Sequence, residues 1–117
     1  MTTDCIFCQI VAGQAPARVV HQDDLVTAFW DIRPVAPVHI LVVPNRHYES
    51  LREMGEGDGA VLGRIVQVAN QVARQEGIDR SGYRFIVNVG PDAGQIVYHV
   101  HFHLIGGRPL GPMVLRR

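Results

Sequence analysis

The stretch His99-Val100-His101-Phe102-His103-Leu104 alternates imidazole and apolar side chains. Successive side chains of a β-strand point to opposite faces of its sheet, so this alternation predicts a strand, which we expect over residues 96–105. The apolar residues of the stretch would then face the core. The three imidazoles would share the other face, with their Cα atoms roughly 6.5 to 7 Å apart, and would line a groove.

More strands and two helices are predicted upstream of this stretch. β-branched and aromatic runs predict strands at 18–21, 25–31, 38–43 and 83–89, and helical spacing of apolar residues predicts helices at 5–12 and 60–76. Short turns separate most of these segments, which favours antiparallel pairing over repeated βαβ units. We therefore expect an α+β fold, a five-stranded antiparallel sheet with one long and one short helix.

The long helix carries two neighbouring apolar stripes. One consists of Val61, Ile65, Val68 and Val72, and the other of Leu62, Val66, Ala69 and Ala73. Together they make a face wider than packing on one sheet requires, which predicts contact with a second subunit. A deeply buried helix in a monomer is the alternative.

Length and composition limit the possible functions. The 117 residues, 47% hydrophobic and 19% charged, suit a single domain spanning 1–117. The formal net charge is +0, so there is no general basic field to attract nucleic acid, and we expect no nucleic-acid partner. All basic residues are arginines, which excludes Walker-A loops and Schiff-base lysines. A Gly-x-Ser-x-Gly elbow is also absent, which excludes hydrolases built on that motif.

Two further features bear on location and on metal binding. The longest strongly apolar run, 38–43, is too short to span a bilayer, and the N-terminus lacks the pattern of a secretory signal. We therefore expect a cytoplasmic protein without a membrane partner. In that compartment the pair Cys5-x-x-Cys8 indicates metal or redox chemistry more than a structural disulfide.

The histidine cluster admits two chemical interpretations. Histidines at positions i and i+2 of a strand can share a zinc or iron ion, although few carboxylates lie near them in the sequence. Alternatively, a neutral imidazole can attack an electrophilic phosphorus while its neighbours donate hydrogen bonds and a proton. An ordinary pKa of about 6.5 makes both protonation states of imidazole accessible near neutrality.

The segment from Gly94 to Arg108 resembles the signature of the histidine triad (HIT) superfamily. The blocks at 29–32, 36–44 and 83–88 are also similar to segments of this family, and Gly106-Gly107-Arg108-Pro109 resembles its histidine-triad nucleotide-binding branch. The resemblance implies a purine nucleoside phosphoramidase that works through a nucleotidyl-histidine intermediate. It also implies a homodimer in which the two sheets form one continuous sheet.

The resemblance assigns catalytic roles to four histidines. His101 would be the nucleophile that attacks the α-phosphorus, and His103 would contact the phosphate oxygens and stabilise charge in the transition state. His99 and His39 would complete a hydrogen-bonded imidazole network that moves the proton to the leaving amine.

The resemblance also implies a purine nucleotide site. Asp31 would accept hydrogen bonds from the ribose hydroxyls, and apolar side chains would form the slot for the purine. The residues expected in this site are Phe7, Ile10, Phe29, Asp31, Ile32, Asn88, Gly94, Gln95, Ile96 and Val97. Asn88 and Gln95 would orient the 5′-oxygen and the phosphate. Ile96 stands where family members commonly have a hydroxyl, so the leaving-group preference stays open.

Family members with the cysteine pair can complete a zinc site with two histidines, which here correspond to His47 and His99. The resemblance thus implies a structural Cys₂His₂ zinc site made of Cys5, Cys8, His47 and His99, which is not required for the chemistry. No redox or organic cofactor is expected.

Three alternative functions stay open from the sequence. The first is a dinucleoside polyphosphate hydrolase or nucleotidyl transferase of the same superfamily, although the Gly-Gly-Arg run weighs against it. The second is a nucleotide-binding or scaffolding protein without a catalytic role. The third is an enzyme with a catalytic metal bound by the histidine triad.

Overall fold

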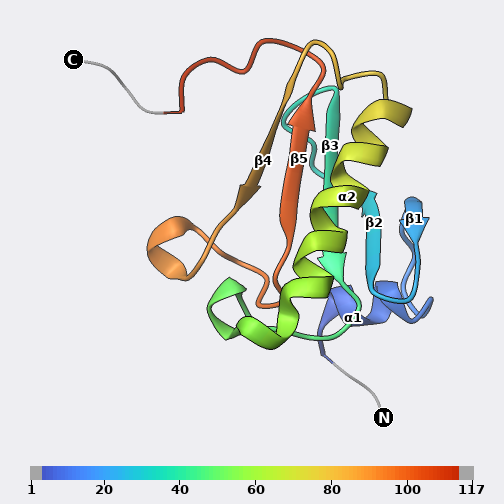
Figure 1. Ribbon diagram of the computed structural model, residues 1–117, viewed down its shortest axis with the longest axis vertical. Coiled ribbons are helices and arrows are strands. Elements are labelled where there is room, and N and C mark those ends of the chain that lie inside the picture. Colours follow the sequence, from blue (N-terminus) through green and yellow to red (C-terminus); the bar gives the residue numbers. More distant parts are fainter. Residues whose placement is uncertain (1–3, 114–117) are drawn as a thin grey trace.

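The fold is a five-stranded antiparallel sheet with one helix on each face (Figure 1). The computed structural model describes residues 4–113. The elements are α1 (Ile6–Val11), β1 (Val19–Gln22), β2 (Val26–Trp30), β3 (Val38–Pro44), α2 (Gly59–Gln75), β4 (Tyr83–Val87) and β5 (Phe102–Gly106). The strand order is β1-β2-β3-β5-β4, and each neighbouring pair is antiparallel. The predicted α+β architecture is therefore confirmed.

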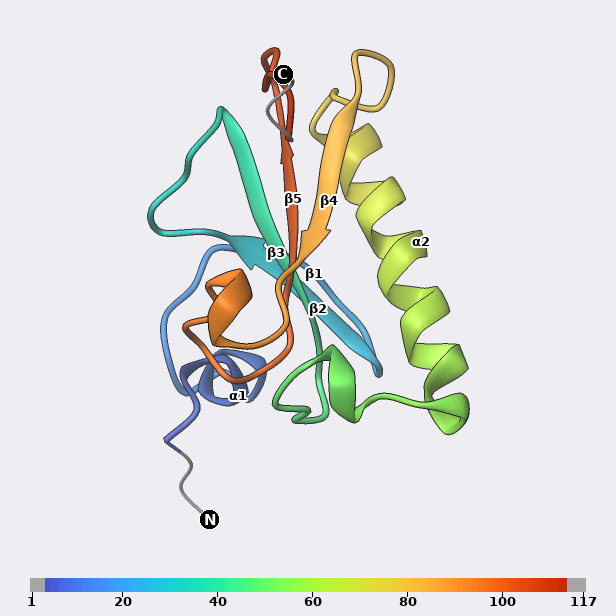
Figure 2. The ribbon, with the colours of Figure 1, turned by 90° about the vertical axis from the view of Figure 1, so that its left-hand side faces the viewer.

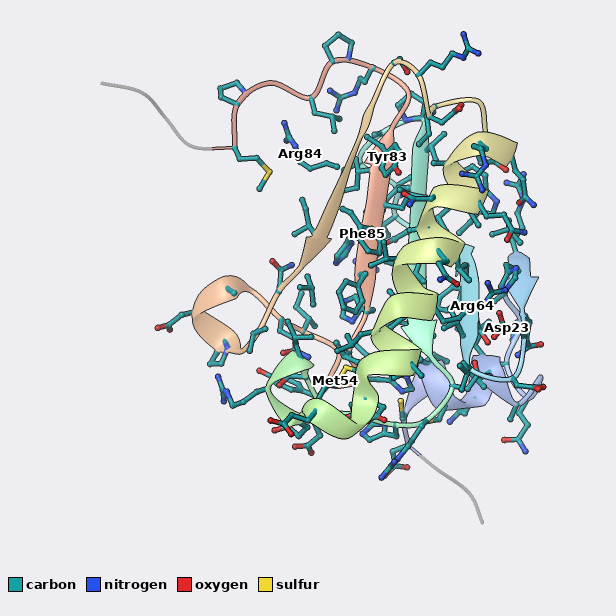
Figure 3. The ribbon with its side chains drawn as sticks, in the orientation of Figure 1. Asp23, Met54, Arg64, Tyr83, Arg84 and Phe85 are labelled. Carbon is teal, nitrogen blue, oxygen red and sulfur yellow. The ribbon has the colours of Figure 1, made fainter. Side chains whose placement is uncertain are left out.

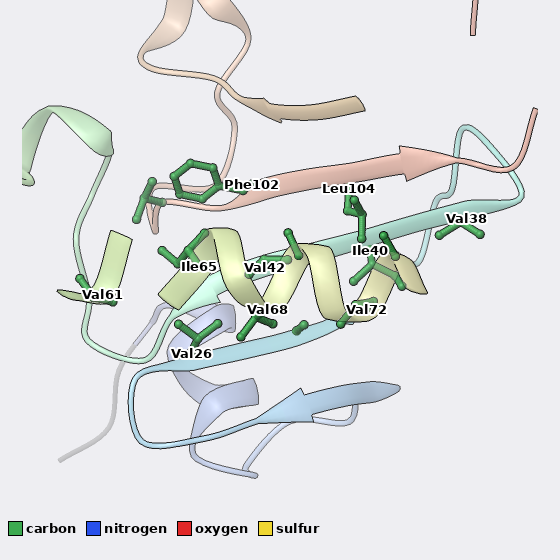
Figure 4. Close-up of a cluster of buried hydrophobic side chains, with 14 of the residues drawn as sticks. Val26, Val38, Ile40, Val42, Val61, Ile65, Val68, Val72, Phe102 and Leu104 are labelled. Atoms are coloured by element: carbon green, nitrogen blue, oxygen red, sulfur yellow. The ribbon is translucent and has the colours of Figure 1, made fainter. Parts of the chain in front are cut away.

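The long helix α2 covers one face of the sheet, and the short helix α1 lies on the other (Figure 2). Successive residues of β3 point to opposite faces of the sheet, and both faces are covered, so all seven of its residues are buried. Ile40 and Val42 belong to the core cluster beneath α2 (Figure 4). Leu41 and Val43 join Phe7 of α1 in a second cluster.

The apolar residues of the histidine stretch lie where the sequence predicts. Val100, Phe102 and Leu104 are buried in the core cluster beneath α2. His103 therefore lies on the opposite face of the sheet, where it pairs in register with Leu41 of β3. This face, beside α1, is the one that carries the candidate site.

The predicted strand at 96–105 is too long, because β5 begins only at Phe102. Residues 95–101 instead form an irregular segment that is anchored by long-range hydrogen bonds. The N–H of Val100 donates to the carbonyl of Tyr48 at 2.7 Å, so this amide is not available to a sheet partner. His103 is consequently the one triad histidine within β5. The strand predicted at 83–89 also ends earlier, at Val87.

The carboxylate of Asp23 links the β1–β2 hairpin to α2. In the turn, Asp23 accepts hydrogen bonds from the amides of Leu25 and Val26, which closes the hairpin. Its second oxygen accepts from Arg64 of α2 at 2.8 Å (Figure 3). The same oxygen lies 2.7 Å from Nε2 of His21. This arrangement links the edge of the sheet to the helix that covers it.

The outer face of α2 is less apolar than the sequence suggests. Within the second stripe, Ala69 and Ala73 are buried between α2 and the sheet of the same chain. Leu62 is half-buried, and Val66 is 51% exposed. Only part of this stripe is therefore available to another subunit. Among the described residues, no helix is both long and apolar enough to cross a membrane.

Candidate functional site

A cavity of about 560 Å³ opens on the face of the sheet beside α1. Its apolar walls come from α1, β2 and β3, and its polar groups come from the ends of β2 and β4 and from the histidine stretch. The lining residues are Ile6, Phe7, Ile10, Ala15, Pro16, Ala17, Phe29, Trp30, Asp31, Ile32, Arg33, Leu41, Asn88, Gly94, Ile96, Val97, His101 and His103. A slot with apolar walls and a few polar groups is typical of sites for small organic ligands.

Most residues expected to bind a nucleotide line this cavity. The exceptions among the expected nucleotide-binding and catalytic residues are Gln95, His39 and His99, which lie behind its wall. Leu41 was not expected to line the cavity, although it shares a face of β3 with His39 and could have been found from that spacing. Ile6, Trp30, Arg33 and the connector 15–17 also line the cavity and were not expected there. Arg33 and the connector carry no sequence pattern that points to a site.

The ring of His101 is held in one tautomer by a backbone carbonyl. Its Nδ1 lies 2.8 Å from the carbonyl oxygen of His99. Because a carbonyl oxygen only accepts hydrogen bonds, Nδ1 carries the proton in the neutral ring, and Nε2 keeps a free lone pair. Phe7 packs edge-on against this ring, with centroids 5.1 Å apart, and limits its rotation. His101 can therefore act as a nucleophile or base through Nε2.

The ring of His103 is held in the opposite tautomer by a chain of hydrogen bonds. The backbone N–H of Val35 donates to Nδ1 of His39 at 3.2 Å, so the proton of the neutral His39 ring is on Nε2. That Nε2 lies 2.9 Å from Nδ1 of His103 and donates to it. The neutral His103 ring must then carry its own proton on Nε2, where it is a hydrogen-bond donor.

Burial keeps these rings neutral. It lowers the pKa of His103 to about 4, with a smaller contribution from the neighbouring His101 and His39 rings. It also lowers the pKa of His101 and of His39 below their ordinary value, against the attraction of the Asp31 carboxylate. At pH 7 the site thus presents a lone pair on His101 beside an N–H donor on His103, with ring centroids 5.0 Å apart.

His99 does not belong to the imidazole network that we expected. Its ring is fully buried and donates from Nε2 to the carbonyl of Pro44 at 2.8 Å, while Nδ1 faces the two cysteines. The irregular backbone before β5 turns this side chain away from the cavity. His99 reaches the site only through its carbonyl oxygen, which fixes the tautomer of His101.

Gln95 is also not positioned to contact a ligand with its side chain. Its amide nitrogen donates to the carbonyls of Glu49 and Val97, and its amide oxygen accepts from the N–H of Gly90. All of these groups belong to the backbone, so Gln95 holds the loop before the triad in place. Asn88, in contrast, lines the cavity and makes no side-chain hydrogen bond to any residue in the range 4–113.

Asp31 lies at the edge of the cavity, just after β2. One carboxylate oxygen accepts from the N–H of Arg33 at 2.7 Å, and the other lies 3.4 Å from Nε2 of His39. A carboxylate oxygen has more than one lone pair, so Asp31 can accept further hydrogen bonds from a ligand. Its charge also favours the proton on Nε2 of His39.

Asp31, His39 and His103 bring their ligand atoms within 4.8 Å of one another, which raises the metal interpretation again. A cation bound to Nε2 of His39 would need the lone pair on that atom. The Val35 N–H, however, donates to Nδ1 and thereby places the proton on Nε2. The hydrogen bonds therefore favour an imidazole pair over a metal site at these three residues.

A second cluster behind the cavity has the donor set of a zinc site. Cys5 and Cys8, at the start of α1, meet His47 and His99, and the four ligand atoms lie within 4.8 Å of one another. Nδ1 of His99 lies 3.3 and 3.4 Å from the two sulfurs, and Nδ1 of His47 lies 3.3 Å from that of Cys8. Sulfur and nitrogen ligands of a tetrahedral zinc ion lie about 3.5 Å apart, so these residues fit the ion.

The surroundings of the cluster also suit a metal ion. Because Nε2 of His99 donates to the Pro44 carbonyl, the lone pair of its Nδ1 points toward the cysteines, as in zinc sites whose histidines are oriented by a carbonyl. Burial and the adjacent Cys5 thiol raise the pKa of Cys8 to about 11. Binding of a cation would favour the thiolate forms of this pair.

Comparison with known proteins yields a family match and close relatives. The family model described as HIT domain matches residues 12–110. Over 117 residues the chain is 47% identical to a protein of Escherichia coli (strain K12) named purine nucleoside phosphoramidase, covering 100% of this chain and 98% of that protein.

Solved structures show the same fold. A HIT family hydrolase from Clostridium thermocellum superposes with a TM-score of 0.93 at 41% identity, covering 98% of this chain and 100% of that one. A histidine triad protein from Clostridium difficile also has a TM-score of 0.93, at 43% identity, with 97% and 99% covered. The similarity thus extends over nearly the whole chain.

Proposed function

The chain belongs to the HIT-domain family, and we propose that it hydrolyses purine nucleoside 5′-phosphoramidates. The products would be a nucleoside monophosphate and a free amine. The relative from Escherichia coli whose name describes this activity is similar over the full length of the chain. The proposal concerns the reaction and its residues, whereas the natural amine is left open.

The observation that carries this proposal is the pair of opposite tautomers at the end of the cavity. His101 offers a lone pair at Nε2, and His103 offers an N–H at its own Nε2. A phosphoryl group placed between them can be attacked by the first ring while its oxygens accept a hydrogen bond from the second. This combination serves nucleophilic displacement at phosphorus better than it serves simple binding.

The first step forms a covalent intermediate. Nε2 of His101 attacks the α-phosphorus, the phosphorus–nitrogen bond breaks, and its electron pair leaves with the amine, which takes up a proton from water in the open cavity. Nδ1 of His101 stays protonated and continues to donate to the carbonyl of His99, which stabilises the positive charge on the ring. His103 donates to a phosphoryl oxygen as negative charge develops there.

The second step releases the nucleotide. Water attacks the phosphorus, the bond to His101 breaks with its electron pair returning to Nε2, and the proton from water leaves to solvent. One water molecule is consumed for each phosphorus–nitrogen bond, so the reaction balances as a hydrolysis. His39 and Asp31 keep His103 in the donor tautomer through both steps.

The rest of the cavity suits the nucleoside. Phe7, Phe29 and Leu41 supply apolar surface for a purine, and Asp31 is placed to accept from the ribose hydroxyls. Ile96 lines the cavity with 87% of its surface exposed and has no side-chain donor, so it would contact a leaving group only through apolar atoms. It is therefore the residue of this site that we expect to influence leaving-group preference.

Substrate profiling tests this function. We expect adenosine 5′-phosphoramidate to be hydrolysed with a kcat/KM at least about tenfold above that of a diadenosine polyphosphate, equivalent to about 1.4 kcal/mol of transition-state stabilisation. The measurement is chromatographic detection of AMP from both substrates at equal enzyme concentration. A reversed preference would assign the chain to dinucleoside polyphosphate hydrolysis, and tight nucleotide binding without turnover would indicate a binding protein.

We propose, in addition, that Cys5, Cys8, His47 and His99 bind a structural zinc ion. The ion would supply no step of the hydrolysis. It would join the start of α1 to the loop after β3 and to the irregular segment before β5. Through α1 it would also support Phe7, which packs against the rings of both His99 and His101.

We also propose that the chain forms a homodimer through α2 and β4. Strand β4 lies at an edge of the sheet, and its residues Tyr83 and Phe85 are only partly buried beside α2 (Figure 3). Val66, on the same helix, is 51% exposed. Pairing of two β4 edges would join the sheets and cover these side chains.

Replacing Val66 with glutamate is expected to weaken the dimer by about 10²-fold or more, because it places two like charges in an apolar contact. Gln67→Glu introduces the same charge at the next position and serves as the matched control. Sedimentation velocity over a concentration series measures the association of both variants. A wild-type chain that stays monomeric at micromolar concentration, or equal association of both variants, contradicts this interface.

A further inference from the structure

The turn that follows β5 packs against the loop between β2 and β3. Gly107 adopts a left-handed conformation with φ +96°, and a Cβ atom at this position would come within 2.9 Å of Pro37 Cβ. The next residue, Arg108, donates from Nη2 to the carbonyl oxygen of Val35 at 2.8 Å. The Gly-Gly-Arg run thus contacts the loop at two points that are close in sequence.

Val35 connects this turn to the catalytic histidines. Its own N–H donates to Nδ1 of His39, and His39 in turn donates to Nδ1 of His103. Hydrogen bonds thus connect the exposed guanidinium of Arg108 through Val35 and His39 to His103, whose Nε2–H faces the cavity. Arg108 itself is exposed and does not line that cavity.

The loop offers Val35 little other support. The side chain of Val35 is 60% exposed, and Ile32, Arg33, Pro34 and Pro37 are exposed as well. Because burial of these side chains contributes little, the position of the Val35 backbone depends on hydrogen bonds and on the contact of Pro37 with Gly107. Within residues 4–113, Arg108 is the one side chain found to donate to the backbone of this residue.

If the Val35 amide moved away, the Asp31 carboxylate would be the remaining group that favours the proton on Nε2 of His39, and the other tautomer of this ring would become more populated. A proton on Nδ1 of His39 would leave Nε2 as an acceptor, and His103 would then donate from Nδ1 instead of accepting there. Nε2 of His103 would lose its proton and could no longer donate to a phosphoryl oxygen. One displaced amide can therefore shift the tautomer equilibria of both imidazoles.

We propose that Arg108 is a positioning residue for the reaction, which holds the Val35 backbone and thereby fixes the tautomers of His39 and His103. The kinetic part of this inference rests on the proposed function, whereas the tautomer part does not. Because Arg108 lies outside the cavity, its loss should lower kcat and leave nucleotide binding intact.

The test compares Arg108→Met with Arg108→Lys. Methionine keeps an unbranched stem without a donor, and lysine restores a charged donor. Arg80→Met is the matched control, since no hydrogen bond of the Arg80 side chain is found within residues 4–113. Imidazole ¹⁵N chemical shifts of the substrate-free protein report the tautomers of His39 and His103, and steady-state kinetics report kcat and KM for adenosine 5′-phosphoramidate.

In Arg108→Met we expect the His39 and His103 shifts to move toward mixed tautomers, and kcat to fall by about three- to tenfold, as for loss of one hydrogen bond. KM should stay within about twofold, and Arg108→Lys should recover most of both effects. Unchanged ¹⁵N shifts in Arg108→Met, or a loss that Arg80→Met shares, would overturn the proposal. Wild-type protein without phosphoramidase activity would refute the proposed function alone, because the shifts would still decide the role of Arg108.

Discussion

The variant His101→Ala is expected to lose at least about 10³-fold in kcat for adenosine 5′-phosphoramidate, because the substitution removes the nucleophile. No other described side chain in the cavity offers an equivalent lone pair. His103 directs an N–H into the site, and His39 and His99 lie behind its wall. Pre-steady-state and steady-state measurement of AMP release checks this result.

The affinity for AMP distinguishes loss of catalysis from loss of the binding site. The apolar slot and Asp31 are unchanged in His101→Ala, so the dissociation constant for AMP should stay within about threefold of the wild-type value. His21→Gln serves as a matched histidine control, because His21 contacts Asp23 in the hairpin and lies outside the cavity. Its kcat should equal that of the wild type within about twofold. If His101→Ala kept more than a tenth of the wild-type kcat, His101 would not be the nucleophile.

Removal of zinc is expected to lower the stability of the fold. At a zinc concentration of about 10³ times its dissociation constant, binding stabilises the fold by about 4 kcal/mol. For a chain of this size, chelation should then lower the melting temperature by roughly 10 to 15 °C. Calorimetry with and without a chelator measures the shift, and elemental analysis should find about one zinc ion per chain.

The double variant Cys5→Ser/Cys8→Ser provides the control for this experiment. It should melt at the lower temperature from the start and should show no further shift with chelator. At 25 °C the wild type should retain most of its kcat after chelation, since the ion takes part in no step of the proposed reaction. An absence of zinc in protein purified without chelators, or an equal chelator effect on both proteins, would rule out this site.

The sequence was sufficient to predict the sheet and most of the cavity. Alternation fixed which side of the histidine stretch is buried, and Val100, Phe102 and Leu104 are in the core as expected. Resemblance to the family placed Phe7, Asp31 and several other lining residues in one site, although not Leu41 or Arg33. These predictions depend on local periodicity and on contiguous segments, which a sequence displays directly.

The details that could not be predicted depend on contacts between distant backbone atoms. The ring of His99 turns away from the cavity because it donates a hydrogen bond to the carbonyl of Pro44. The side-chain amide of Gln95 donates to the backbone carbonyls of Glu49 and Val97. The link from Arg108 to Val35 joins backbone and side chain 73 positions apart. Side-chain types alone do not encode such partners, because a carbonyl is present at every residue.

The covalent intermediate on His101 can be trapped and detected directly. Wild-type enzyme would be mixed with adenosine 5′-phosphoramidate, quenched within the first turnover under alkaline denaturing conditions, digested, and examined by mass spectrometry. We expect an acid-labile adenylyl adduct on the peptide that contains His101, located on that residue and missing from His101→Ala. Rapid turnover without an adduct, or an adduct on His99 or His103, would show that His101 is not the nucleophile.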